Sequence, residues 1–372
     1  MSGPVMIMAG GTGGHVYPAL AVANSLIAGG TDVVWLGTRR GLEARVIPQQ
    51  QIPIEWITVS GLRGKGVIGW LLAPFRLIRA LFQSLSILRK IQPCAVLGMG
   101  GFVSGPGGVA ARLLGRSLVI HEQNAVAGLT NRLLARIADR VLEAFPGSYP
   151  NLRRVTPGIE TVGNPVREEI LSVPEPNQRL AGRSGNLRLL ILGGSQGALR
   201  LNSMVPQALA RVDRASRPEV WHQAGEKTLE QAKTAYRQQS VDARIEPFID
   251  DMAGAYGWAD LVICRAGALT VFELAAAGLP AVLVPFPSAV DDHQTLNADW
   301  LVRAGAAVLL PEEELTAMSL ARILQRFAGD RRELLAMANR ARALAAPDAC
   351  DKVVQACLSG ARFSMNRREG RS

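Results

Sequence analysis

The stretch "MAGGTGGHVYP", residues 8–18, places four glycines around one threonine, followed by a histidine. The run before it, residues 5–9, is wholly apolar and predicts a buried strand, and apolar residues recur at helical spacing from Ala19 to Ile27. Glycines between a strand and a helix let backbone N–H groups approach a ligand, and a helix N-terminus favours an anion. The stretch therefore predicts a loop that holds a phosphate-type ligand, and a tight turn that binds nothing is the alternative.

The same arrangement returns in the second half of the chain. The segment "LRLLILGGSQGALRLN", residues 187–202, again joins an apolar run to a helical run through a glycine loop. Between the two loops, strands are predicted near residues 33–37, 54–59, 94–98, 117–121 and 139–142, with helices between them. Such alternation predicts a parallel sheet that is covered by helices on both faces.

Prolines and glycines gather between residues 146 and 165, as is typical of a connection between domains. We therefore predict an α/β protein with two Rossmann-like domains facing a cleft, residues 1–163 and residues 164–346. A C-terminal helix at about 347–362 is expected to pack back on the first domain. Ligands of such sheets bind beyond the carboxyl ends of the strands, so both glycine loops are expected to face the cleft.

Composition fits a globular protein with a large core, since hydrophobic residues make up 48% and charged residues 19% of the chain. Two long segments, residues 91–111 and 274–290, carry no charged residue. Their glycines and prolines exclude a lipid-exposed helix, because the freed backbone groups would lack partners. Both segments are interpreted as buried parallel strands with flanking turns.

Basic charge is concentrated in the first half of the chain. Residues 1–163 carry 16 Lys and Arg against 7 Asp and Glu, a net charge of +9, whereas residues 164–372 carry 25 against 24. A basic surface favours nucleic acid or anionic lipid as a partner, and charge spread over a solvated surface is the alternative.

Residues 71–90 predict an amphipathic helix. Its apolar stripe consists of Leu71, Phe75, Ile78, Phe82 and Leu85. Basic residues lie beside the stripe or shortly upstream of it: Arg63, Lys65, Arg76, Arg79 and Lys90. This combination fits a helix that lies on an anionic membrane, although a helix facing the core would have the same stripe.

A nicotinamide or flavin enzyme of this fold needs the pattern G-x-G-x-x-G and an acidic residue at the end of the second strand. Gly11 and Gly13 supply the first two glycines, but Val16 stands at the third position. Asp32 begins the second predicted strand instead of ending it. The sequence therefore excludes this reading.

The second half offers a better nucleotide site in "CRAGALTVFELAAAGLP", residues 264–280. After a predicted strand, this segment places Gly267 and Thr270 at a helix start and Glu273 one turn further on. Glu273 could accept both hydroxyls of a ribose, or it could simply complement the helix dipole. Upstream, Phe248 and Ile249 form an apolar pair that could flank a base.

Seven segments, taken together and in order, resemble the MurG family of bacterial glycosyltransferases. They are "MAGGTGGHVYPALAVA", "SGLRGKG", "GMGGFVSGPGG", "HEQNAVAGLTNRLLA", "GNPVR", "GGSQGA" and "CRAGALTVFELAAAGLP". The resemblance runs over nearly the whole chain and implies the two-domain GT-B fold. It implies transfer of N-acetylglucosamine from UDP-N-acetylglucosamine to the C4 hydroxyl of N-acetylmuramyl-pentapeptide on undecaprenyl diphosphate.

The resemblance further implies a peripheral protein at the cytoplasmic face of the inner membrane, with other cell-wall synthesis proteins as possible partners. It implies that the donor's uracil meets the backbone of Ile249, beside Phe248, and that Glu273 holds the ribose. Ser195 and Arg167 are expected near the diphosphate. The residues of the implied donor loop are Ala268, Leu269, Thr270, Val271, Phe272 and Glu273.

The sugar and the first domain have implied residues of their own. Asn124 and Gln294 are expected at the sugar hydroxyls. Thr12, Gly13 and Gly14 are expected to approach the donor and the acceptor from the first domain.

An inverting transfer needs a base for the acceptor hydroxyl, charge stabilisation on the leaving diphosphate and a positioned sugar. His15, at the exit of the first glycine loop, is one candidate base, because an imidazole titrates near neutral pH. Glu122 in "HEQN" is the other candidate, at the end of a predicted strand. His15 could also be a helix-start residue that only bonds a phosphate, and His121 is expected to be structural.

No D-x-D pattern occurs in the chain, so no metal and no cofactor is expected. Arg167 and the backbone N–H groups that follow Gly193, Gly194 and Ser195 would take the metal's place at the diphosphate. A UDP-N-acetylglucosamine 2-epimerase shares the fold and the donor, but has no need of a basic lipid-facing helix. A nucleic-acid-binding protein would explain the charge but not the paired glycine loops.

Overall fold

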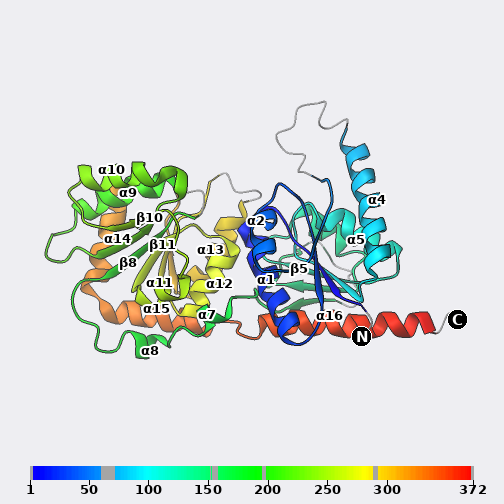
Figure 1. The fold of residues 1–372 in the computed structure, drawn as a ribbon. Helices are drawn as coiled ribbons and strands as arrows, with labels where there is room; N and C mark the ends of the chain where they lie inside the picture. The colour runs from blue at the N-terminus through cyan, green and yellow to red at the C-terminus, as the bar shows by residue number, and fades with distance from the viewer. Residues whose placement is uncertain are drawn as a thin grey trace. The chain divides into compact units, whose positions relative to one another are not determined.

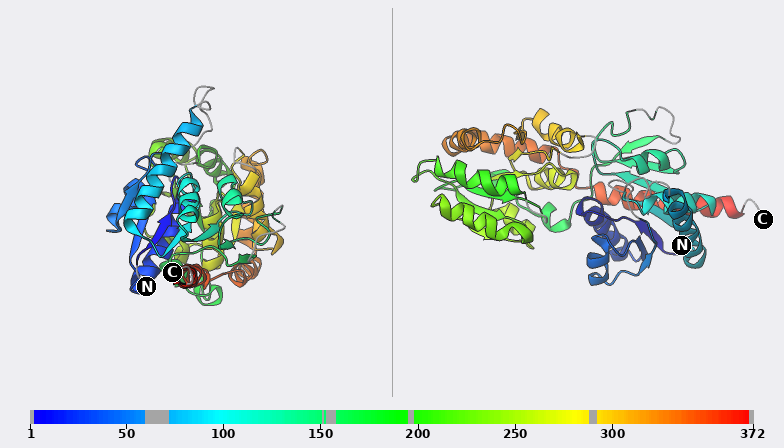
Figure 2. Two further views of the ribbon diagram at one scale, coloured as in Figure 1. Left: turned by 90° about the vertical axis from the view of Figure 1, so that its right-hand side faces the viewer. Right: turned by 90° about the horizontal axis from the view of Figure 1, so that it is seen from above.

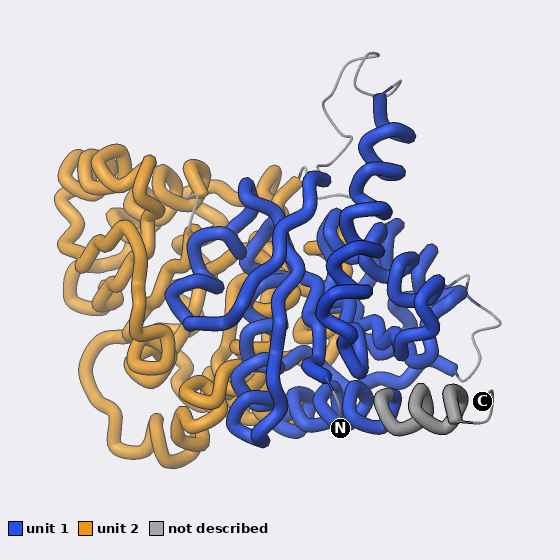
Figure 3. Tube along the Cα trace, turned by 45° about the vertical axis from the view of Figure 1, so that its right-hand side comes forward, with its two compact units in different colours: residues 1–166, 347–372 blue, residues 167–346 orange. Residues whose placement is uncertain are grey.

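The structure is a computed structural model that describes residues 3–59, 72–150, 152, 158–194, 198–287 and 292–369, the last nine of these as backbone only. The chain divides into two compact units, which are coloured separately in Figure 3. Unit 1 comprises residues 1–166 and 347–372, and unit 2 comprises residues 167–346.

In the described part of unit 1, seven strands form one parallel sheet. The strand order is β3-β2-β1-β4-β5-β6-β7. The strands are β1 (Val5–Met8), β2 (Val33–Gly37), β3 (Ile54–Trp56), β4 (Ala95–Gly98), β5 (Ser117–Glu122), β6 (Arg140–Glu143) and β7 (Ile159–Thr161). The predicted parallel sheet of the first half is therefore confirmed.

Helices cover both faces of this sheet (Figure 1). Alternate side chains of β1 point to opposite faces, as in any strand. Val5 and Ile7 join a core with α1 (Gly13–Ala28) and α16 (Ala349–Glu369). Met6 and Met8 join a core with α4 (Ala73–Ile91) and α5 (Ser104–Leu113). The other helices in the described part of unit 1 are α2 (Glu43–Gln49) and α6 (Leu129–Leu134).

The helix α16 lies far along the chain from the rest of unit 1 but packs into its core. Val353, Ala356 and Cys357 are fully buried among residues of α1 and the central strands. The fit is close, because a Cβ added at Gly360 would lie 2.2 Å from Oγ of Ser117 on β5. Figure 1 shows α16 running beside α1.

The interpretation of residues 91–111 as buried strand with flanking turns is confirmed for β4 but wrong for residues 104–111, which form part of α5 (Ser104–Leu113). Two glycines of this helix are needed because a larger side chain would clash with neighbouring side chains, and not because the chain turns there. A Cβ at Gly107 would lie 2.2 Å from Sδ of Met8, and a Cβ at Gly108 would lie 2.8 Å from Cδ2 of Leu134. The helix can therefore approach the sheet and α6 closely.

The helix α4 confirms the predicted helix near residues 71–90, apart from Leu71, which lies outside the described residues. On its core side Ala80, Ser84 and Leu88 are buried, and partly buried apolar residues pack against the same core: Leu81, Leu85, Ile87 and Ile91. The N-terminal end of α4 projects beyond the sheet and helices of unit 1 (Figures 1 and 2). Within the described residues, no helix has the length and apolarity that crossing a membrane requires.

The described part of unit 2 holds six parallel strands in the order β10-β9-β8-β11-β12-β13. They are β8 (Arg188–Leu192), β9 (Glu219–Gln223), β10 (Arg244–Glu246), β11 (Leu261–Cys264), β12 (Ala281–Leu283) and β13 (Ala307–Leu309). Helices again flank the sheet: α7 (Glu168–Leu171), α8 (Pro176–Arg179), α9 (Leu199–Ala210), η1 (Glu226–Thr228), α10 (Leu229–Gln238), α11 (Met252–Trp258), α12 (Ala268–Ala277), α13 (His293–Arg303), α14 (Ala317–Gly329) and α15 (Arg331–Ala343).

Candidate active site

The first glycine loop joins β1 to α1, as the sequence predicts. Thr12 is the N-cap in an extended conformation, and its side chain makes no capping hydrogen bond. Gly13 and Gly14 form the first turn of α1, where backbone N–H groups have no partner inside the helix. These groups can receive an anion.

A buried carboxylate that the sequence analysis missed supports this loop. Glu43 accepts a hydrogen bond from Gly11 N at 2.9 Å and from both N and Oγ1 of Thr38, at 3.0 and 2.7 Å. Its side chain fits because a Cβ at Gly10 would lie 2.6 Å from Oε1 of Glu43. Sequence spacing does not reveal Glu43, because its partners Gly11 and Thr38 lie in two other loops that only the fold brings near it.

His15 lies in the first turn of α1 and is half-buried. Its Nδ1 lies 2.9 Å from Oε1 of Gln123, which follows β5. The ring also packs closely against the backbone at Gly100, where a Cβ would lie 2.8 Å from Cε1 and Nδ1 of His15. Gly100 has a φ of +93°, so a side chain there would be strained as well as displacing the imidazole.

Glu122 ends β5 and is buried, with both carboxylate oxygens engaged. Oε1 accepts hydrogen bonds from the backbone N and Nδ2 of Asn124, at 3.0 and 3.2 Å. Oε2 accepts from Gly128 N at 3.1 Å and from Nδ2 of Asn131 at 2.9 Å. Glu122 therefore holds the loop from β5 to α6 in shape, and it holds Asn124 with it.

His121 is fully buried on β5, and burial lowers its pKa to about 4. Its Nε2 lies 2.9 Å from the carbonyl oxygen of Gly163, and its Nδ1 lies 3.1 Å from Nε2 of Gln123. The expected structural role of His121 fits these contacts. Gln123 is a second residue that the sequence analysis missed, and it stands between two histidines.

In unit 2, Glu273 lies one turn into α12, whose N-cap is Gly267. Its side chain is 7% exposed and is paired with Arg167, with Nη2 3.3 Å from Oε1. The Tyr256 hydroxyl donates to Oε2 at 3.0 Å. Burial raises the pKa of Glu273, and Arg167 and Tyr256 oppose that effect. Tyr256 could not be found from sequence spacing.

The other residues of the implied donor loop form the start of α12. Ala268, Val271 and Phe272 are buried, whereas Leu269 and Thr270 are partly exposed. Phe272 stacks on Trp300 with ring centroids 4.7 Å apart. This packing fixes the first turns of the helix that carries Glu273.

The segment that follows β10 carries Phe248 and Ile249, the residues implied at the uracil of the donor. Ile249 is buried and its N–H donates to Oε1 of Gln223 at 3.0 Å, whereas Phe248 is 39% exposed. Gln294, on α13, accepts a hydrogen bond from Phe286 N at 2.9 Å. Ser195 lies outside the described residues.

In each unit, candidate residues follow the carboxyl ends of parallel strands. In unit 1, His15 follows β1 and Gln123 follows β5, and their side chains meet. In unit 2, Ile249 follows β10 and Glu273 follows β11. The carboxyl edge of a parallel sheet is the usual place for ligands in such folds.

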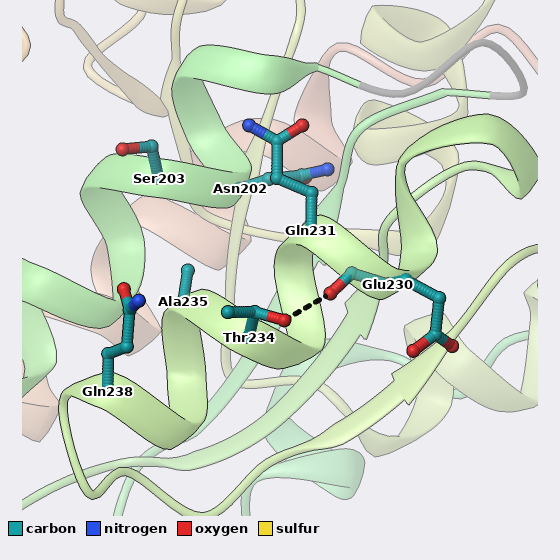
Figure 4. Close-up of a pocket in the computed structure, with 7 residues that line it drawn as sticks. All are labelled: Asn202, Ser203, Glu230, Gln231, Thr234, Ala235 and Gln238. Carbon is teal, nitrogen blue, oxygen red and sulfur yellow. Dashed lines mark hydrogen bonds between the residues drawn. The ribbon is translucent and has the colours of Figure 1, made fainter.

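A groove elsewhere in unit 2 contains none of the predicted residues. It has a volume of 490 Å³ and lies between α9 and α10, with polar side chains along it (Figure 4). Thr234 donates to the carbonyl oxygen of Glu230 there. Among the residues that the structure describes, no three His, Cys, Asp or Glu side chains gather as metal ligands would.

The outer side of α4 is apolar and exposed. Phe75, Ile78 and Phe82 are 71%, 52% and 66% exposed. The core-facing alternative is therefore wrong for these three residues. It holds for Leu85, another member of the predicted stripe, which packs against the core. Arg76 and Arg79 are exposed beside them.

Two α/β units, each with a parallel sheet and a glycine loop that leads into a helix, are typical of the GT-B fold of glycosyltransferases. The glycosyltransferase family 28 N-terminal domain matches residues 5–143, and the family 28 C-terminal domain matches residues 188–353. A protein of Alkalilimnicola ehrlichii, named UDP-N-acetylglucosamine–N-acetylmuramyl-(pentapeptide) pyrophosphoryl-undecaprenol N-acetylglucosamine transferase, is 60% identical over 97% of this chain and 100% of its own.

The crystal structure of Acinetobacter baumannii MurG is similar with a TM-score of 0.83 and 43% identity, covering 96% of this chain and 99% of that one. The chain belongs to glycosyltransferase family 28 and, within it, to the MurG family. A putative UDP-N-acetylglucosamine 2-epimerase from Listeria monocytogenes shares only the fold, with 13% identity and a TM-score of 0.66 over 95% of each chain. The epimerase alternative is therefore not favoured.

Proposed function

We propose that the protein transfers N-acetylglucosamine from UDP-N-acetylglucosamine to the C4 hydroxyl of N-acetylmuramyl-pentapeptide on undecaprenyl diphosphate, with inversion at the anomeric carbon. The observation that carries this proposal is the full-length relative that is 60% identical and is named for this transfer. The described geometry supports it. The carboxylate of Glu273 in unit 2 and the oriented imidazole of His15 in unit 1 each follow a strand at the edge of a parallel sheet where ligands usually bind.

Unit 2 is proposed to hold the donor. The uracil would meet the backbone of Ile249 beside Phe248, and the ribose hydroxyls would donate to Glu273. Because the Glu273 carboxylate is already oriented by Arg167 and Tyr256, it would meet the ribose with little reorganisation. Arg167, Ser195 and the N–H groups at the start of α9 would stabilise the charge that develops on the leaving diphosphate.

The sugar and the transfer site complete the proposed donor contacts. Asn124 and Gln294 would bind the sugar hydroxyls, and the donor loop from Ala268 to Phe272 would line the nucleotide beside Glu273. Thr12, Gly13 and Gly14 would approach the transferred group and the acceptor's own diphosphate through their backbone N–H groups.

His15 is proposed as the general base. It would take the proton of the acceptor hydroxyl while the hydroxyl oxygen attacks the anomeric carbon and the bond to the UDP oxygen breaks. Glu122 is the weaker candidate because N–H donors already occupy both of its oxygens. No divalent metal is needed in this scheme, so we expect activity to persist in a chelator, and rescue by added magnesium after loss of activity would contradict it.

The protein is proposed to act as a peripheral protein at the cytoplasmic face of the inner membrane, where its lipid-linked acceptor would be found. Phe75, Ile78 and Phe82 would enter the lipid interface, and the nearby arginines would bind anionic headgroups. Other cell-wall synthesis proteins could bind there too. Nucleic acid is not a proposed partner.

The test is a transfer assay with purified protein, labelled UDP-N-acetylglucosamine and the lipid-linked acceptor. We expect labelled lipid product that depends on both substrates, with release of UDP. A 2-epimerase would change the sugar nucleotide with no acceptor present. Conversion without acceptor, or no lipid product in its presence, would overturn the proposal.

A further inference from the structure

Three side chains of unit 1 form a continuous line of hydrogen bonds, from buried His121 through Gln123 to His15. We propose that Gln123 is a positioning residue that decides which nitrogen of His15 carries the proton, leaving Nε2 bare for the acceptor hydroxyl. The inference rests on the proposed role of His15 as base. It concerns a separate property, the tautomer of the imidazole, which can be measured without any reaction.

The state of His121 is set by the carbonyl oxygen of Gly163, which can only accept a hydrogen bond. Nε2 of His121 lies 2.9 Å from the carbonyl oxygen of Gly163, so this nitrogen must carry a hydrogen. Because burial lowers the pKa of His121 to about 4, the ring is neutral at neutral pH. Its other nitrogen, Nδ1, therefore has a free lone pair and acts as an acceptor.

The amide of Gln123 is then oriented by two acceptors at once. Its Nε2 lies 3.1 Å from Nδ1 of His121 and 3.1 Å from the carbonyl oxygen of His121. An amide nitrogen has two hydrogens and matches both acceptors, whereas an amide oxygen would face two lone pairs. The oxygen Oε1 must therefore point the other way, towards His15.

Oε1 of Gln123 lies 2.9 Å from Nδ1 of His15 and can only accept. A neutral His15 therefore carries its hydrogen on Nδ1 and has its lone pair on Nε2, since the partner of one ring nitrogen sets the state of the other. The backbone at Gly100 limits rotation of the ring from its side. The Nε2 nitrogen is thus prepared as a base before any substrate binds.

A carboxylate usually holds a catalytic histidine in this way, and the wrong tautomer can remove most of the activity. An uncharged amide fixes the same tautomer without placing a negative charge beside the ring. Gln123 is itself buried, with its Nε2 bonded to His121 and its Oε1 bonded to His15, so it keeps this orientation with little freedom to rotate. The role of Gln123 is therefore to orient and polarise, and the reacting atoms do not touch it.

The test uses the full chain labelled with ¹⁵N at its four histidines, and long-range ¹H–¹⁵N spectra that report which ring nitrogen is protonated. A His15→Ala variant assigns the His15 signals. We expect the Nδ1–H form for neutral His15 in the wild-type protein. Gln123→Met, which keeps the length of the side chain but has no amide, should give a mixture of both forms.

Gln123→Glu keeps an acceptor for Nδ1 of His15, and its second oxygen can donate to Nδ1 of His121 when the carboxyl is protonated. The Nδ1–H form of His15 should therefore return at pH values where this buried carboxyl is neutral. Gln325→Met is the matched control, since Gln325 is also bonded through Nε2 to a backbone carbonyl but lies in unit 2. In the transfer assay, we expect Gln123→Met to lower kcat at least about tenfold, out of the 10²–10⁴ that a positioned base supplies. KM for UDP-N-acetylglucosamine should stay within about twofold, because Gln123 itself has no proposed contact with the donor.

An Nε2–H form in the wild-type protein, or an unchanged Nδ1–H form in Gln123→Met, would overturn the inference even if the enzyme is active. Unfolding midpoints of all variants identify a loss that comes from folding alone, and the rescue by Gln123→Glu separates orientation from packing. Failure of the proposed function is a different result. It would appear as absent transfer by the wild-type protein while the spectra still report Nδ1–H at His15.

Discussion

Arg167 and Glu273 form an ion pair in unit 2, with Nη2 of Arg167 3.3 Å from Oε1 of Glu273, although 106 positions separate them in the chain. The family resemblance assigns Arg167 to the diphosphate and Glu273 to the ribose. Their pairing means that the two parts of the nucleotide would be bound by groups that already orient each other. The proposed donor site would therefore be partly ordered before the nucleotide arrives.

The first prediction concerns this carboxylate. Glu273→Ala is expected to weaken UDP binding by roughly 10- to 100-fold, because hydrogen bonds to a charged group contribute about 1.5–3 kcal/mol. The chemical step should lose less, since a ribose contact is present in both ground and transition states. Isothermal calorimetry with UDP measures the effect, with Glu219→Ala as an exposed control in the same unit. Equal affinities of wild type and Glu273→Ala would remove the ribose assignment.

The second prediction compares the two candidate bases. His15→Ala should lower kcat by about 10²–10⁴ with little change in UDP affinity. Glu122→Gln should mainly lower the stability of unit 1, because it replaces an acceptor by a donor opposite the amide of Asn131. Rate measurements and urea unfolding on both variants separate these effects. Loss of rate in Glu122→Gln alone, with a normal unfolding midpoint, would exchange the two roles.

The third prediction concerns α4. Replacing Arg76 and Arg79 by Gln should weaken binding to anionic vesicles by about 2 kcal/mol at low salt, since each basic residue near the surface contributes about 1 kcal/mol. Added salt should shrink the difference. Lys90 is a poorer target than its sequence position suggests, because its Nζ lies 3.3 Å from Glu55.

Vesicle flotation across a salt series tests this prediction. Phe75→Ser with Phe82→Ser should weaken binding at every salt concentration, because the apolar contribution is not screened. Arg211→Gln with Arg214→Gln, in unit 2, is the charge-matched control. If the α4 variants float like the wild type, the surface of α4 has another purpose.

The fourth prediction concerns acid. Burial lowers the pKa of His121 to about 4 and that of His222 to about 3, from 6.5. Below pH 6.5 these two histidines become protonated in the unfolded chain but stay neutral in the folded protein. The free energy of unfolding therefore falls as pH falls towards 4. Between pH 6.5 and 4, each histidine lowers the free energy of unfolding by about 3 kcal/mol at most. Urea unfolding at several pH values should show a shallower pH slope in His222→Gln, and an identical slope would contradict this account.

The framework of both units could be predicted from the sequence because apolar runs and glycine loops follow local rules. The run before Gly10 forms β1, and the run before Gly193 forms β8. Gly267 caps α12 at the predicted place, which sets Glu273 one turn further on. Each of these features depends on neighbours in the sequence, so spacing alone can reveal it.

Contacts between distant segments could not be predicted in this way. Tyr256 and Gln123 carry no periodic signal, and each acts through a partner that only the folded sheet brings near. The stripe on α4 was ambiguous because an exposed apolar face and a buried one have the same spacing. Only the burial of Ala80 and Leu88 on the opposite side decides between them.

The packing of α16 into unit 1 has a consequence for the order in which the protein is made. Residues 1–166 leave the ribosome first, but the core around β1 and α1 lacks Val353, Ala356 and Cys357 until translation passes residue 357. Unit 2 is continuous and can fold while this core still has an open apolar side. The unit whose synthesis begins first is therefore completed last, and a nascent chain halted before residue 349 would present a surface for chaperones to bind.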